Sequence, residues 1–134
     1  MKARKLGLDV GSKNLGVAIS DPLGQTARHL KTIARGKISD EVRQINAIVR
    51  EYNIEEIVVG MPFNMDGTKG PQAREVEDYI GILKKELRIP INIWDERLTS
   101  VSAKNYLKGK KAALTHQVAA AIILQTYLDW QRHQ

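Results

Sequence analysis

KLGLDVGSKNLGVAIS, residues 5–20, is the stretch on which the predicted fold depends. Two apolar runs, Leu6–Val10 and Leu15–Ile19, flank the polar segment Gly11–Asn14. Short apolar runs separated by a few turn-forming residues are typical of a β-hairpin. The chain is therefore expected to contribute two antiparallel strands joined by a tight turn.

Asp9 interrupts the first of these strands. A carboxylate in a strand that is buried on both faces is costly unless a positive group neutralises it. A divalent cation, or a phosphate bound through one, is a suitable partner. Alternatively, Asp9 braces the turn by accepting hydrogen bonds from the backbone N–H groups of Gly11 or Ser12.

Length and composition are those of one soluble domain. The chain has 134 residues, of which 43% are hydrophobic and 27% charged, so we expect a single domain over residues 1–134. Cysteine is absent, which excludes disulfides and thiolate metal sites. The longest apolar run, Val118–Leu124, is too short to span a bilayer, and the basic N-terminus does not lead into a signal peptide. We therefore expect a cytoplasmic protein with no membrane partner.

The chain is also basic. Its 21 Lys and Arg residues exceed its 15 Asp and Glu residues, which gives a net charge of +6. Such a surplus favours a polyanionic partner, most simply nucleic acid or the ribosome. Many small basic proteins bind no polyanion, so the charge supports this class of partner without establishing it.

The rest of the pattern predicts an α/β fold. A helix with Ser39 as its N-cap is expected between two buried strands, and this makes a parallel crossover. The strands expected after the hairpin are Thr26–Ile33, Ile57–Gly60 and Ile89–Ile93. The expected helices are Asp40–Tyr52, Gln72–Leu87, a short one from Thr99 or Ser100 to Leu107, and a last one from His116 to about Arg132, after a basic loop. Together they predict one mixed, five-stranded sheet with helices on both faces.

Acidic residues occur on two of these strands. Asp9 lies on the first, and Asp95 and Glu96 close the last. Ligands of α/β sheets collect at the carboxyl ends of strands, and paired carboxylates suit Mg²⁺ or Mn²⁺. Because successive side chains alternate in a strand, we favour Glu96 for the site and expect Asp95 to pair with Arg97 or neighbouring backbone. The alternative is that this strand end is simply solvated.

Four segments then decide between these interpretations. They are residues 8–13 (LDVGSK) with 16–18 (GVA), 58–68 (VVGMPFNMDGT), 95–100 (DERLTS) and 119–128 (AAAIILQTYL). In this order, over nearly the whole chain, they resemble the YqgF (RuvX) family. The resemblance implies an RNase H-like fold, similar to Holliday junction resolvases, and a metal-dependent nuclease that hydrolyses phosphodiester bonds in pre-16S rRNA processing. The first segment alone also resembles the actin-like ATPases, so a small nucleotide binder is a further class to test.

The resemblance also implies the site residues. Its acidic site corresponds to Asp9 and the Asp95-Glu96 pair, and its third acid, at the start of the last helix, corresponds here to His116. A neutral imidazole can complete a Mn²⁺ site, and this is the role we favour. Otherwise the site is degenerate and the domain is a non-catalytic nucleic-acid or ribosome-associated binding module.

We expect a two-metal hydrolysis in which Asp9, Glu96 and His116 are the metal ligands. The basic residues expected to neutralise phosphates near the cleft are Lys13, Arg97, Lys108, Lys110 and Lys111. Asn64 and Thr68 are expected either to contact the nucleic acid or to brace their own loop. The sequence leaves open structured RNA or branched DNA as substrate, ribosome precursors as partners, and the oligomeric state.

Overall fold

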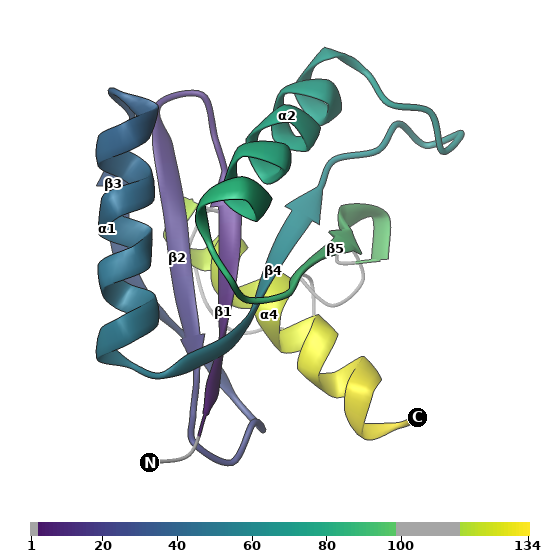
Figure 1. Cartoon of the computed structure of the whole chain (residues 1–134). Coiled ribbons are helices and arrows are strands. Elements are labelled where there is room, and N and C mark those ends of the chain that lie inside the picture. Colours follow the sequence, from purple (N-terminus) through teal and green to yellow (C-terminus); the bar gives the residue numbers. More distant parts are fainter. Residues whose placement is uncertain (1–2, 99–115) are drawn as a thin grey trace.

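A computed structural model describes residues 3–98 and 116–134, with the side chains of the last helix described from Val118 onward. The elements follow in chain order: β1 Arg4–Val10, β2 Asn14–Ser20, β3 Ala27–Ala34, α1 Ile38–Glu51, β4 Ile54–Met61, α2 Pro71–Glu86, β5 Ile91–Asp95, the 3₁₀ helix η1 Glu96–Leu98, and α4 His116–Arg132. The strands form one sheet in the order β3-β2-β1-β4-β5 (Figure 1).

Strand pairing confirms the predicted mixed sheet. β1 pairs antiparallel with β2, and β2 pairs antiparallel with β3, which makes the three-stranded meander. β1 and β5 each pair parallel with β4, so the crossovers through α1 and α2 are present. The first hairpin closes with a hydrogen bond of 2.9 Å from the Gly11 N–H to the Asn14 carbonyl. The acidic residues on β1 and at the end of β5 therefore flank a single intervening strand, β4.

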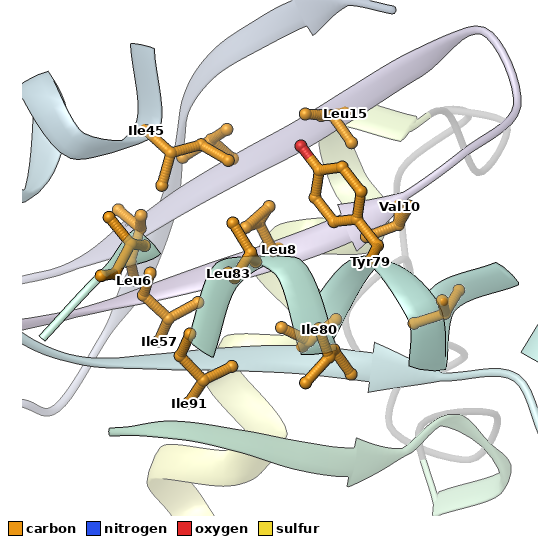
Figure 2. Close-up of a cluster of buried hydrophobic side chains, with 14 of the residues drawn as sticks. Leu6, Leu8, Val10, Leu15, Ile45, Ile57, Tyr79, Ile80, Leu83 and Ile91 are labelled. Atoms are coloured by element: carbon orange, nitrogen blue, oxygen red, sulfur yellow. The ribbon is translucent and has the colours of Figure 1, made fainter. Parts of the chain in front are cut away.

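Alternation along the strands divides the core between two faces of the sheet. Helices α1 and α2 cover one face, and α4 covers the other (Figure 1). Leu6 and Leu8 of β1 and Ile57 of β4 are fully buried on the α1/α2 face, where Leu83 of α2 packs near them (Figure 2). Because the strand period is two, the residues between them in sequence face α4.

The α4 face depends on small residues. A Cβ atom on Gly7 would lie 2.8 Å from the Leu124 Cβ and 3.0 Å from the Ala120 carbonyl oxygen. Glycine at this position therefore lets α4 pack directly on β1. The buried run from Ala120 to Leu124 confirms that this last helix is packed on the sheet, as its apolar composition predicted.

The first helix begins earlier than predicted. Its N-cap position is Lys37, which makes no side-chain capping bond, and the predicted cap Ser39 lies inside the helix. The Lys37 carbonyl accepts hydrogen bonds of 3.1 Å from the N–H groups of Asp40 and Glu41, so the helical bonding already starts there. The Glu41 side chain is drawn inward rather than toward solvent.

Glu41 is the acceptor of a buried network. Its exposed fraction is 1%, and it accepts hydrogen bonds from the Arg35 side chain at 3.2 Å, the Gly36 N–H at 2.7 Å and the Tyr79 hydroxyl at 3.0 Å. Arg35 also donates to the Gly11 carbonyl at 2.7 Å. Burial and the Glu41 charge raise the pKa of Tyr79. This network connects α1 and α2 with the turn that follows Asp9.

The limits of β4 and β5 also differ from the prediction. β4 runs from Ile54 to Met61, so it begins earlier and ends one residue later than the predicted strand Ile57–Gly60. β5 begins at Ile91 rather than Ile89, since Pro90 has no N–H to give to the ladder, although its carbonyl accepts the Ile57 N–H at 3.0 Å. The predicted short helix between Thr99 and Leu107 lies outside the described residues. Of the helices in 3–98 and 116–134, none is long and apolar enough to cross a membrane.

Candidate functional site

The site is built on the face of the sheet that α4 covers. Asp9 follows the buried Leu8 on β1 and therefore lies on the same face as Gly7, against which α4 packs. Leu8 pairs with Val59 of β4, so the β4 residue beside Asp9 is Gly60. The local arrangement follows from the hairpin and crossover that the sequence predicts.

Gly60 leaves room for the second acid. It pairs with Trp94 of β5, and β5 ends at the next residue, before η1 begins at Glu96. A Cβ atom on Gly60 would lie 3.1 Å from the Glu96 Cγ and 2.5 Å from the Ile123 Cδ1 of α4. The Glu96 side chain therefore extends back over β4, between the sheet and α4, in the direction of Asp9.

The electrostatics agree with this placement. Burial raises the pKa of Glu96, the Asp9 charge raises it further, and the Asp95 charge adds a smaller effect, so that it reaches about 7 against an ordinary value of 4.5. Two carboxylates brought together in a partly dehydrated space disfavour the doubly ionised state. A cation bound between them would remove this repulsion.

Asp95 has a different environment. Its carboxylate accepts two hydrogen bonds from the Arg97 Nε, at 3.1 and 3.0 Å, and one from the Arg97 Nη2 at 2.7 Å. It also accepts the Arg97 backbone N–H at 2.9 Å. These hydrogen bonds hold the pKa of Asp95 below its usual value. The predicted pairing of Asp95 with Arg97 is confirmed.

Arg97 also reaches the loop between β4 and α2. Its Nη1 donates to the Met65 carbonyl at 3.3 Å, and its guanidinium lies 5.6 Å from the centroid of the Phe63 ring. One side chain thus connects the carboxylate at the end of β5 with the loop that follows β4. These contacts lie within the protein, so the expected contact of Arg97 with phosphates stays a prediction.

Asn64 and Thr68 face each other across the same loop. The Asn64 Nδ2 donates to the Thr68 Oγ1 at 3.0 Å, and the Asn64 N–H donates to the Thr68 carbonyl at 2.8 Å. The Thr68 hydroxyl donates to the Asp66 carboxylate at 2.6 Å. Both side chains therefore brace the loop, which was one of the two roles expected for them. The other expected role, a contact with nucleic acid, stays a prediction.

Of the other predicted site residues, the structure describes only the side chain of Lys13. Lys13 is exposed in the hairpin turn. His116 is the first residue of α4, but its side chain lies outside the described part of the structure, as do Lys108, Lys110 and Lys111. Within the described side chains, no group of three or more His, Cys, Asp or Glu residues is arranged to hold a metal ion.

Gly60 is the position that the sequence interpretation missed. It was predicted only as the last residue of a strand, whereas it supplies the space through which Glu96 reaches the α4 face. The available signal was alternation, because Gly60 lies two residues after the buried Val58 on the same face of β4. Glycine within a strand marks a close approach, and here the approaching groups are Glu96 and Ile123.

A pocket also lies on the opposite face of the sheet, which α1 and α2 cover. Its volume is about 580 Å³, and it is lined by the hairpin turn and by residues of α2 that include Val76 and Tyr79. It does not contain the acidic pair. Chemistry that depends on Asp9 and Glu96 therefore belongs to the α4 face and not to this pocket.

Comparison with known proteins identifies the family of the chain. The model of the RuvX family, described as Holliday junction resolvase, matches residues 3–130. A Clostridium tetani protein named "Putative pre-16S rRNA nuclease" is 47% identical over 132 residues, which cover 94% of this chain and 96% of that relative. A Halothermothrix orenii protein of the same name is 43% identical over 134 residues, which cover 96% of each.

Solved structures share the fold at much lower identity. RuvC from T. thermophilus, in complex with a Holliday junction substrate, has a TM-score of 0.70 at 14% identity and covers 98% of this chain and 96% of its own. The yeast mitochondrial Holliday junction resolvase has a TM-score of 0.60 at 12% identity, with 98% and 80% covered. These likenesses confirm the predicted RNase H-like α/β fold. Because the family model spans most of the chain and relatives above 40% identity cover nearly all of it, the chain belongs to the RuvX family.

Proposed function

We propose that this protein is a metal-dependent nuclease that hydrolyses phosphodiester bonds, with Asp9 and Glu96 at the centre of its site. The observation that carries the proposal is that Glu96 extends over Gly60 toward Asp9 on the α4 face. Membership of the RuvX family supports the reaction class. The curated relatives are named as nucleases of pre-16S rRNA, and we propose the same substrate class here.

The donor set fits a hard divalent cation. Both groups are carboxylates, and oxygen ligands suit Mg²⁺ and Mn²⁺. Their mutual repulsion, which raises the pKa of Glu96, is relieved when a cation lies between them. A cation held there would supply Lewis-acid chemistry, which would polarise the phosphodiester and favour ionisation of the attacking water.

The residues of the chain have separate roles in this proposal. Asp9 and Glu96 would hold the cation, with Glu96 giving up its proton, while Ile123 of α4 packs against the Glu96 side chain and limits its contact with water. Asp95 acts indirectly, because it fixes Arg97 beside the loop that follows β4. Arg97 is then the cation nearest to the acidic strand end along the chain, and we propose that it meets a backbone phosphate.

His116 is proposed as the third ligand. It is the first residue of α4, the helix packed on the face that carries Asp9. A neutral imidazole in place of a carboxylate would lower the negative charge of the site and favour Mn²⁺ over Mg²⁺. Lys13 and the basic residues of 108–111 are proposed to bind the substrate strand outside the site.

The competing function is a binding module without catalysis. It would follow if His116 had replaced an essential acid and left the site degenerate. The names of the relatives favour the nuclease over this alternative. A ribosome precursor as partner and the cytoplasm as location belong to the same proposal.

Cleavage assays test the proposal directly. Labelled single-stranded RNA and a four-way DNA junction are incubated with Mg²⁺ or Mn²⁺ and with one protein at a time. The proteins are the wild type, Asp9→Asn, Glu96→Gln, His116→Asp and the surface control Glu86→Gln. The proposal predicts cleavage of the RNA that is lost in the two site variants and kept in the control. Cleavage that survives Asp9→Asn would contradict it, and cleavage gained only in His116→Asp would identify the native protein as a binding module.

A further inference from the structure

Three aromatic side chains form a cluster beside the acidic strand end. Trp94 of β5 and Tyr127 and Trp130 of α4 have ring centroids 5.7 to 5.9 Å apart. Trp94 and Tyr127 are 8% and 7% exposed, whereas Trp130 is 48% exposed. A mostly buried cluster with one open ring is suited to stacking a flat ligand on that ring.

A pocket of about 490 Å³ adjoins the cluster, and we name it the tryptophan pocket. Besides the three aromatic residues, it is lined by Asn92, Ile93, Asp95 and Leu98. The exposed fractions of Ile93 and Leu98 are 45% and 57%, so apolar side chains form an accessible rim. Trp94 of this pocket pairs with Gly60 of β4, the residue over which Glu96 extends, so the pocket lies beside the candidate site.

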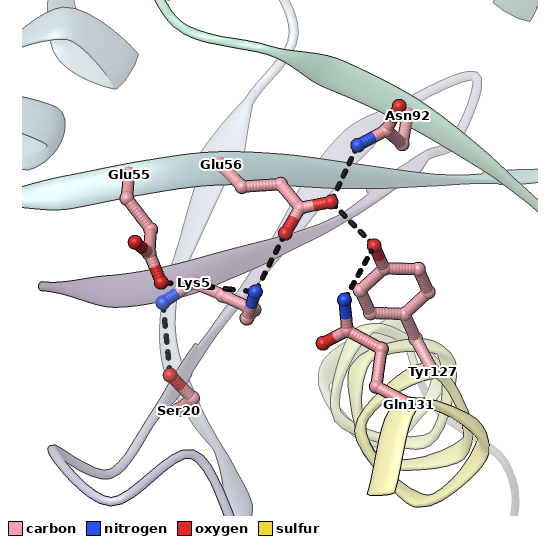
Figure 3. Close-up of polar contacts among 7 residues, drawn as sticks. All are labelled: Lys5, Ser20, Glu55, Glu56, Asn92, Tyr127 and Gln131. Atoms are coloured by element: carbon pink, nitrogen blue, oxygen red, sulfur yellow. Dashed lines mark hydrogen bonds and ion pairs between the residues drawn. The ribbon is translucent and has the colours of Figure 1, made fainter. Parts of the chain in front are cut away.

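A polar network holds two residues that line this pocket, Asn92 and Tyr127 (Figure 3). Glu56 of β4 accepts hydrogen bonds from the Tyr127 hydroxyl and the Asn92 amide, and it pairs with Lys5 at 2.8 Å. Gln131 of α4 donates to the Tyr127 hydroxyl at 3.1 Å. Burial alone would raise the pKa of Glu56, but the hydrogen bonds from Lys5, Tyr127 and Asn92 keep it lowered, so Glu56 stays ionised as their acceptor. The Tyr127 ring and Asn92 are thereby held in place before any ligand arrives.

Trp94, which lines the pocket, also carries an unused donor. The Trp94 Nε1–H is buried and has no hydrogen-bond partner among the described residues. A buried donor without an acceptor is unfavourable, and a polar ligand atom or a water molecule relieves it. The Trp94 donor is closed off by surrounding atoms, whereas the ring of Trp130 is open to a ligand with a flat face.

We propose that the tryptophan pocket holds an unpaired base of the substrate strand next to the acidic pair. This inference rests on the proposed nuclease function and extends it to the form of the substrate. Nucleobases combine a π face with acceptor atoms, and stacking on aromatic side chains is a general mode of single-strand binding. The positive charge of the chain favours the same polyanion over an apolar protein segment. A continuous duplex keeps its bases stacked on each other, so the pocket selects single-stranded or splayed nucleic acid.

The two tryptophans of the chain are both in this pocket, which makes intrinsic fluorescence a specific probe. Asp9→Asn protein, which should not cleave, is titrated with a single-stranded RNA oligonucleotide, with the same strand carrying abasic positions, and with a duplex. We expect the intact single strand to quench tryptophan emission and to bind more tightly than the abasic strand and the duplex. Equal affinity for intact and abasic strands would overturn the inference.

Substitutions at Trp130 supply the second test, because its ring is half exposed and its loss should leave the fold intact. In the same background, Trp130→Ala is expected to weaken RNA binding by about 5- to 100-fold, the range for loss of one stacked base. Trp130→Phe should retain most of the affinity, and Leu23→Ala, at an exposed residue of the β2–β3 turn, should retain all of it. Circular dichroism and the oligomeric state are measured for each variant.

The outcomes separate this inference from the proposed function. RNA binding that depends on Trp130, in a wild-type protein that cleaves nothing, supports the pocket and refutes the nuclease. Cleavage by the wild type with unchanged RNA affinity in Trp130→Ala refutes the pocket and leaves the nuclease intact. A change from dimer to monomer in Trp130→Ala with unchanged RNA affinity would show that a second copy occupies the pocket, and this also overturns the inference.

Discussion

Replacing Glu96 with glutamine should stabilise the metal-free protein in neutral and alkaline solution. The pKa of Glu96 in the folded protein is about 7, against 4.5 for an ordinary glutamate, because burial and the Asp9 charge oppose its ionisation. At about 1.4 kcal/mol for each pKa unit, ionising this side chain in the folded state costs about 3 kcal/mol. Glutamine has nearly the same shape and no charge to dehydrate.

The sign of the pH dependence follows from proton binding. The folded protein binds the Glu96 proton more tightly than the unfolded chain, so the free energy of unfolding of the wild type falls as the pH rises from about 4.5 to 7. Well above pH 7 the free energy of unfolding no longer changes with the ionisation of Glu96. The advantage of Glu96→Gln should therefore be absent near pH 4 and reach about 3 kcal/mol at pH 8 in the presence of a chelator.

Urea denaturation between pH 4 and pH 8, followed by circular dichroism, measures this difference. With the slopes usual for small proteins, about 3 kcal/mol moves the urea midpoint by roughly 1 to 3 M. Glu86→Gln, at an exposed position of α2, is the matched control and should follow the wild type. A Glu96→Gln variant that is no more stable than the wild type at pH 8, or equally stabilised at every pH, would refute the buried carboxyl pair.

Three further predictions follow from the packing and the ion pairs. Gly60→Ala should lower the free energy of unfolding by about 1–3 kcal/mol in urea melts, because its Cβ would lie 2.5 Å from the Ile123 side chain of α4. The control Gly81→Ala, on a helix with open space around the position, should leave the stability unchanged or raise it. Glu41→Gln should cost about 3 kcal/mol, since it leaves a partly buried arginine without its counter-charge, while Asp40→Asn, in an exposed pair, should cost less than about 1 kcal/mol. Asp9→Asn should lower the pKa of Glu96 toward its usual value in a carboxyl-detected NMR titration, and an unchanged pKa would mean that the two groups do not interact.

Much of the fold could be predicted from local patterns. The hairpin, the crossover through α1 and the last helix each have a hydrophobic period that one element can satisfy, and the structure confirms them. The predicted start of α1 was wrong. Ser39 is a good N-cap residue in isolation, but in the structure the Lys37 carbonyl accepts the first hydrogen bonds of the helix. Capping preference is worth about 1 kcal/mol, which tertiary contacts override.

The candidate site could be predicted only in part. Acidic residues at strand ends indicated Asp9 and Glu96, and strand alternation separated Glu96 from Asp95, whose pairing with Arg97 the structure confirms. The role of Gly60 could not be predicted, because it depends on which side chains from β5 and α4 come close to β4. The Glu56 network was missed for the same reason, since its partners come from β1, β5 and α4.

Titration of metal-free protein with Mn²⁺ by calorimetry at pH 8 tests the central claim, that Asp9 and Glu96 form one cation site. The claim predicts binding by the wild type and by Glu86→Gln, and loss of measurable binding in both Asp9→Asn and Glu96→Gln. Mn²⁺ binding of unchanged affinity in either of these two variants would contradict it.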